Sequence, residues 1–169
     1  MSSSGFPRAG FFIRLAAIVY DLLVVAAVLM FAAAMALAFS VALATLGWWP
    51  LAEGMDHSER IDHWLFQVYL VVVLVGFYGL FWSRGGQTLG MKAWRLRVQN
   101  TNNQAISFRQ AIIRFFTALG GLGNIWVVFN RDKLALQDLA AKCEVVRLTP
   151  EANQFKNWRQ PAQEAKPSQ

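Results

Sequence analysis

The sequence predicts an all-α membrane protein with two transmembrane helices, a third helical segment that is interfacial or re-entrant, and a small cytoplasmic β-pair. Two stretches without charged residues, 22–50 and 64–83, each reach the ~20 apolar residues that cross a bilayer. A third stretch, 115–130, is shorter and is interrupted by glycines. Hydrophobic residues make up 56% of the chain and charged residues 15%, against ~45–50% and ~25% in soluble domains. The composition therefore agrees with a small membrane domain.

The first span is expected at about residues 22–46. Arg8 and Arg14 precede it, as basic residues precede the apolar part of a signal peptide. The apolar run is about twice the ~7–15 residues of a signal peptide, so an uncleaved anchor helix is predicted. Small side chains recur at every fourth residue, and either the second span or another copy of the chain is expected to pack on this ridge. The ridge consists of Ala32, Ala36, Ser40 and Ala44.

The second span, 64–83, begins and ends near a tryptophan. Trp64 and Trp82 lie ~27 Å apart along a helix that rises ~1.5 Å per residue, close to the ~30 Å thickness of the hydrocarbon core. We expect them to mark opposite interfaces, with Trp48 and Trp49 at the same outer interface as Trp64. Packing of these tryptophans against other helices is the alternative.

Basic residues in the short loops set the orientation of the two spans. The loop 53–62 is acidic and carries Arg60 as its cation, whereas the segment 84–114 has basic residues and no acid. Because cytoplasmic loops are enriched in Lys and Arg, the segment 84–114 is predicted inside. The N-terminus is then cytoplasmic and the acidic loop is outside.

The third apolar region, about residues 107–130, is predicted to form a bent helical hairpin. Ser107 is a plausible N-cap, and residues 120–123 supply a glycine-rich bend. Apolar side chains follow helical spacing, while Arg114 falls on a polar side that is expected to face the headgroups. A full third span is the alternative, and it would place the C-terminus outside. The polar side consists of Ser107, Gln110, Arg114 and Thr117.

Two short strands flank this region. Residues 94–99 alternate apolar and polar side chains, which is typical of a half-buried strand, and residues 144–148 are a second β-prone stretch after a helical segment at 134–141. Pairing of the strands would hold both flanks on one side, so the C-terminus is predicted to be cytoplasmic. Residues 1–150 then form one membrane domain, and the polar stretch 151–169 is expected to be disordered.

Few features of the sequence indicate a catalytic, cofactor or metal site. No nucleophile with a base and no cofactor loop is visible, so no enzyme and no cofactor are predicted. The lone Cys143 forms no internal disulfide, and His57 and His63 in the acidic loop lack the spacing of a metal pair, so no metal is predicted. The net charge is +6, and the basic residues flank the apolar segments. This arrangement indicates anionic lipid on the cytoplasmic face, rather than nucleic acid, as the partner.

Three sequence segments together resemble the RDD family of bacterial membrane proteins. They read FIRLAAIVYD, GGQTLGMKAWRLRV and RDKLALQDLAAKCEVV. The resemblance maps the residues that give the family its name onto Arg14, Asp21 and Asp138. Gln137 stands where a histidine is common in the family. The resemblance implies a multi-pass protein of the bacterial cell (inner) membrane, with a suggested part in transport and no defined molecular role.

These three charges have three interpretations. Arg14 and Asp21 lie on nearly the same helix face, and counting back from Trp48 puts Asp21 ~40 Å down the helix, near the cytoplasmic interface. They either fix cytoplasmic elements to the first helix, or carry ions or small ligands, or belong to an accessory or scaffold subunit that docks a partner or lipid. Association with another copy of the chain, as a homo-oligomer, or with a partner membrane protein is left open. The turn at the membrane exit is assigned to Gly86, Gln87, Thr88 and Gly90.

Overall fold

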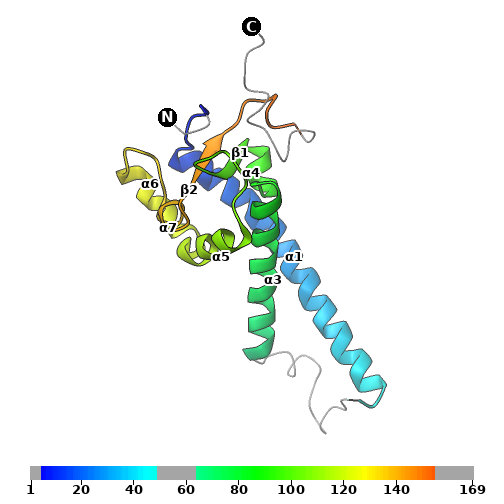
Figure 1. The fold of residues 1–169 in the computed structure, drawn as a ribbon. Coiled ribbons are helices and arrows are strands. Elements are labelled where there is room, and N and C mark those ends of the chain that lie inside the picture. Colours follow the sequence, from blue (N-terminus) through cyan, green and yellow to red (C-terminus); the bar gives the residue numbers. More distant parts are fainter. Residues whose placement is uncertain (1–4, 49–63, 155–169) are drawn as a thin grey trace. The chain divides into compact units, whose positions relative to one another are not determined.

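The computed structural model describes residues 5–48 and 64–154 and is mostly helical (Figure 1). In its described part, two helices are long and apolar enough to span a membrane, which confirms the two predicted spans. Helix α1 starts before the predicted span because it continues through Arg14 and Asp21 without a break. The acidic loop and most of the polar tail lie outside the described residues. In chain order the elements are α1 Phe11–Thr45, α3 Trp64–Arg84, α4 Leu89–Ala93, β1 Leu96–Asn100, α5 Phe108–Thr117, η1 Leu119–Ile125, α6 Trp126–Phe129, α7 Leu136–Ala140 and β2 Cys143–Arg147.

The chain divides into two compact units, of which one comprises residues 23–76. Its described part consists of the apolar stretches of α1 and α3. Ala32 and Ser40 of the small-residue ridge are buried here, and the Tyr69 hydroxyl donates a hydrogen bond to the Ala32 carbonyl at 3.3 Å. The second helix of the same chain therefore packs on the ridge at Ala32.

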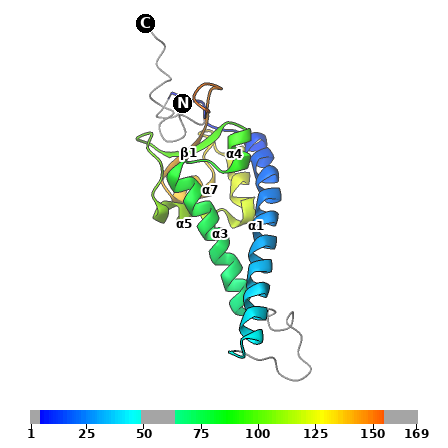
Figure 2. The same ribbon diagram turned by 90° about the vertical axis from the view of Figure 1, so that its right-hand side faces the viewer.

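The other unit, residues 1–22 and 77–169, contains a two-stranded antiparallel sheet of β1 and β2. Val98 pairs with Val145 at its centre, which confirms the predicted pairing. The N-terminal segment extends this sheet, since the Ala9 N–H donates to the Val145 carbonyl at 2.9 Å. The backbone of Arg8 also forms an isolated antiparallel β-bridge with Val146. The segment just before α1 thus lies along the edge of β2. Figure 2 shows the start of α1 at the same end of this unit as β1.

The polar side chains of β1 are buried, although their alternation with apolar ones predicts a half-buried strand. The strand is buried on both faces, and Arg97 and Gln99 are as inaccessible as Val98. Gln99 donates to the Glu144 carboxylate at 3.2 Å, and Gly86 lies so close to the Arg97 side chain that a Cβ atom there would crowd it. The predicted half-buried strand is therefore wrong, because the polar face is covered by the chain itself.

The third apolar region forms the predicted bent hairpin of α5, η1 and α6. Ser107 caps α5 in a capping box with Gln110, as expected. The two arms meet at 82°. Gly120 and Gly121 stand at the bend with φ of 65° and 106°, backbone angles that glycine adopts without steric cost.

The polar side of α5 faces inward instead of toward headgroups. Arg114 is buried, whereas Phe108 and Phe116 on the other side are exposed. The expectation of an outward basic face at Arg114 is therefore wrong. The reason is long-range, since a buried carboxylate from another element pairs with this guanidinium.

Candidate functional site: a buried arginine–aspartate cluster

The cluster is centred on the carboxylate of Asp138, in the short helix α7. This side chain is fully buried, and one of its oxygens accepts the Ala135 N–H at 3.0 Å, which holds the carboxylate at the start of its own helix. Arg14 Nη1 donates to Oδ2 at 2.7 Å. Arg114 Nη1 donates to Oδ1. A single carboxylate is therefore clamped between two guanidinium groups.

Arg14 also donates hydrogen bonds to two backbone carbonyls and to a side-chain amide oxygen. Its Nε donates to the Ala9 carbonyl at 3.1 Å, and its Nη2 donates to the Lys133 carbonyl at 3.0 Å. The Nη1 also approaches Asn124 Oδ1 at 3.4 Å. Arg14 thereby joins the N-terminal segment, α1, η1 and the loop before α7, which is a cross-linking role.

Arg114 enters the cluster from α5. Its guanidinium carbon lies 5.1 Å from the centre of the Trp82 ring, a cation–π contact. The same Nη1 donates to the Cys143 sulfur at 3.3 Å. Burial raises the pKa of the Cys143 thiol, so the sulfur accepts this bond in its neutral form. Trp82 is buried in this contact, so packing, not an interfacial anchor, describes it.

The charges of the cluster do not cancel. Burial alone would raise the pKa of Asp138, but the positive charges of Arg114 and Arg14 and the donated hydrogen bonds hold it below its usual value. The carboxylate is therefore ionised at neutral pH, and two guanidiniums against one carboxylate leave a net positive charge. Gln137 supports this site through Asn124, to whose Oδ1 it donates at 2.9 Å.

Asp21 lies elsewhere and does not join the Arg14–Asp138 pair. Its Oδ1 accepts the Gly90 N–H at 2.8 Å, and its Oδ2 accepts the Thr88 hydroxyl. Thr88 Oγ1 in turn accepts the Met91 N–H at 3.3 Å. Asp21 therefore binds the first turn of α4, where backbone N–H groups have no partner within the helix.

The exit turn provides this contact through its glycines. A Cβ atom at Gly90 would collide with the Ala17 carbonyl and the Asp21 carboxyl group, so only glycine allows α4 to approach α1 this closely. Gly86 accepts the Val98 N–H on its carbonyl at 2.7 Å. Gln87 donates to the Leu96 carbonyl at 2.7 Å. All four residues assigned to the turn thus hold α4 or β1 in place.

Five members of the arginine–aspartate cluster were not predicted as site residues from the sequence. Arg114 was visible as a charge flanked on both sides by apolar residues of α5, a pattern that favours a buried ion pair as much as a headgroup contact. No local pattern indicated that the other four meet at one site. Among residues 5–48 and 64–154, no group of three or more His, Cys, Asp or Glu side chains is placed to hold a metal ion. The five residues are Trp82, Arg114, Asn124, Gln137 and Cys143.

The comparisons with known proteins agree with the resemblance in the sequence. The model of the RDD family matches residues 8–142, which is well over half of the chain. That match includes the whole arginine–aspartate cluster except Cys143. Neither the curated proteins nor the solved structures gave a match.

Proposed function

The chain belongs to the RDD family of integral membrane proteins, and we propose that it is a non-catalytic accessory or scaffold subunit of the bacterial inner membrane. One observation carries this proposal: both oxygens of both buried carboxylates, Asp21 and Asp138, already accept hydrogen bonds from the chain. Each of these oxygens is already bound by a donor of the chain, so a travelling cation would have to compete with that donor. Both instead fasten segments of the chain to α1, which suits a rigid platform for a partner membrane protein.

Ion transport is the second candidate, and the position of Asp21 favours it. This carboxylate lies in a helix apolar enough to span a membrane, where ionisable residues often mark ion paths. A carrier at this position has to exchange the hydrogen bonds from Thr88 and Gly90 for a bound cation in each cycle. The two candidates therefore differ in whether the cap on α4 opens during function.

Flux measurements in liposomes separate these candidates. For a scaffold, the purified chain conducts no Na⁺, K⁺ or H⁺, and Asp21→Asn and Asp138→Asn lower the yield of folded protein. Asp132→Asn serves as the matched control, because its side chain is 75% exposed and makes a long ion pair of 3.5 Å with Arg8. Cation flux in the wild type that Asp21→Asn abolishes at an unchanged folded yield would establish transport instead.

The topology we propose has both termini in the cytoplasm. The Ala9–Val145 hydrogen bond supports it, because two segments of one sheet lie on the same side of a membrane. Two crossings between these residues satisfy that condition, and a third full crossing by the hairpin does not. A phosphatase fused after Gln169 should be inactive and a fluorescent protein there should glow; the opposite pattern refutes this topology.

A further inference from the structure

The bent hairpin exposes a broad apolar surface. Large hydrophobic side chains are exposed along each of its three elements, up to 74% for Phe129. Soluble proteins rarely leave so continuous a run of apolar side chains in water, so this surface has a hydrophobic partner. The exposed residues, which together we call the hairpin surface, are Phe108, Ile113, Phe116, Leu119, Leu122, Ile125, Trp126, Val128 and Phe129.

The contacts of the hairpin within its unit show which parts of the two apolar helices hold it. The Phe115 ring packs on Tyr78 of α3 at 5.7 Å, and Phe108 fills the space beside Gly79 of the same helix. At the other arm, Asn124 contacts Arg14 in α1. The hairpin is therefore fastened to the beginning of α1 and to the C-terminal part of α3.

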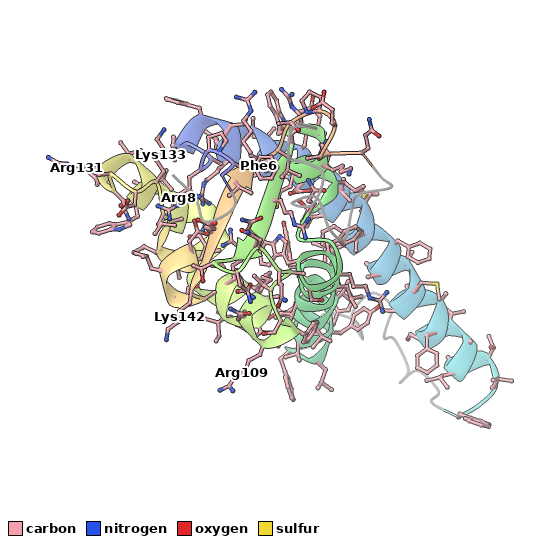
Figure 3. The ribbon with its side chains drawn as sticks, turned by 45° about the horizontal axis from the view of Figure 1, so that its top comes forward. Phe6, Arg8, Arg109, Arg131, Lys133 and Lys142 are labelled. Carbon is pink, nitrogen blue, oxygen red and sulfur yellow. The ribbon has the colours of Figure 1, made fainter. Side chains whose placement is uncertain are left out.

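Four basic side chains lie at the margin of the hairpin surface. Figure 3 shows them pointing outward, away from the body of the unit. All four are exposed, and within the described residues none of them forms an ion pair. The two acids that lie between them in the sequence are paired with other arginines, Asp132 with Arg8 and Asp138 with the two arginines of the buried cluster. The four are Arg109 of α5, Arg131 and Lys133 of the loop after α6, and Lys142 before β2.

We propose that this hairpin docks on the anionic phospholipids of the leaflet at its end of the two spans. The hairpin surface enters the boundary between headgroups and acyl chains, and the four cations bind lipid phosphates around it. Apolar surface alone fits any lipid. The four cations, which form no ion pair within the described residues, are what select anionic headgroups over zwitterionic ones. This surface is separate from the arginine–aspartate cluster and does not depend on the scaffold role.

Lipid retention by the full chain tests the charge selection. The chain is extracted from bilayers that contain equal amounts of phosphatidylglycerol and phosphatidylethanolamine, and bound lipids are counted by native mass spectrometry. Wild type should retain phosphatidylglycerol preferentially. Replacing all four cations by Gln should weaken this preference at least about tenfold, since each cation near an anionic surface contributes roughly fivefold. Swapping Arg and Lys at the same four positions is the matched control and should preserve it. An unchanged preference in the Gln variant overturns the proposal.

Spin labelling tests the depth. Cys143 is buried, so a nitroxide reagent reaches a new cysteine selectively in Phe129→Cys, on the hairpin surface, or in Asn102→Cys, in the exposed turn after β1. In reconstituted bilayers the label at 129 should be more accessible to oxygen, which dissolves in lipid, than to a water-soluble nickel complex. The label at 102 should show the reverse. Greater access of nickel than of oxygen at 129 refutes insertion.

Discussion

Replacing Asp138 by Asn removes the negative charge at the centre of the cluster and almost none of its volume. The two guanidiniums of Arg14 and Arg114 then face each other in a buried site without a counter-charge. Breaking a buried ion pair by removing one partner costs about 3–5 kcal/mol. We expect Asp138→Asn to lie in that range, because this carboxylate is fully buried and serves both arginines.

The comparison with Arg14→Gln sharpens this expectation. That change leaves Arg114 and Asp138 as a balanced pair and removes the surplus positive charge, although it also loses hydrogen bonds to Ala9 and Lys133. Asp138→Asn should therefore be the more damaging single change. The double variant should be less destabilised than the sum of the two, because its second change relieves the charge exposed by the first.

Thermal unfolding in detergent, followed by size-exclusion of the remaining folded protein, measures these effects. At ~2–4 °C per kcal/mol for a chain of this size, Asp138→Asn should lower the unfolding temperature by roughly 10 °C. Asp132→Asn should move it little, because exposed ion pairs contribute about 0–1 kcal/mol. If the two variants unfold at the same temperature, the cluster does not stabilise the fold and the reasoning fails.

Three further predictions concern pH and the α4 cap. The pKa of Asp138 is lowered on folding, so its stabilisation is present above its unfolded pKa of ~3.9 and is lost as pH falls through the folded value. The difference in stability between wild type and Asp138→Asn should therefore be largest near neutral pH and should disappear below about pH 4. Unfolding temperatures measured across this pH range test the prediction. Gly90→Ala should destabilise the fold by about 1–3 kcal/mol through overpacking. The control Gly76→Ala should not, because the space around its Cβ is open. Equal unfolding temperatures of the two variants would contradict the close approach of α4 to α1. Thr88→Val should cost about 1–3 kcal/mol because it leaves Asp21 Oδ2 without its donor, and Thr88→Ser should restore most of that loss; failure of the serine variant to do so would assign the effect to packing.

Features encoded by local patterns were predictable from the sequence. Continuous apolar runs gave the two spans, the glycines at 120 and 121 gave the bend, and Ser107 gave the start of α5. Each depends on neighbours within a few turns of the chain.

The partners of the charges were not predictable in this way. Arg14 and Asp138 are 124 positions apart, and nothing local to either residue states which carboxylate or guanidinium it meets. The same limit explains the error at Arg114 and at Arg97. A basic residue on one face of a helix or strand looks solvent-exposed until the element that covers that face is known, and here the covering elements come from distant parts of the chain.

The spacing of Arg14 and Asp21 acquires its meaning from those distant partners. Seven residues apart, they lie on nearly the same face of α1, about two turns from each other. Arg14 receives α7 through Asp138, and Asp21 receives α4 through Thr88 and Gly90. One polar stripe of α1 thus holds two separate contacts, one with α7 and one with α4. A polar stripe that is fully occupied by the chain's own groups holds elements together, and this arrangement favours a structural junction over an ion path.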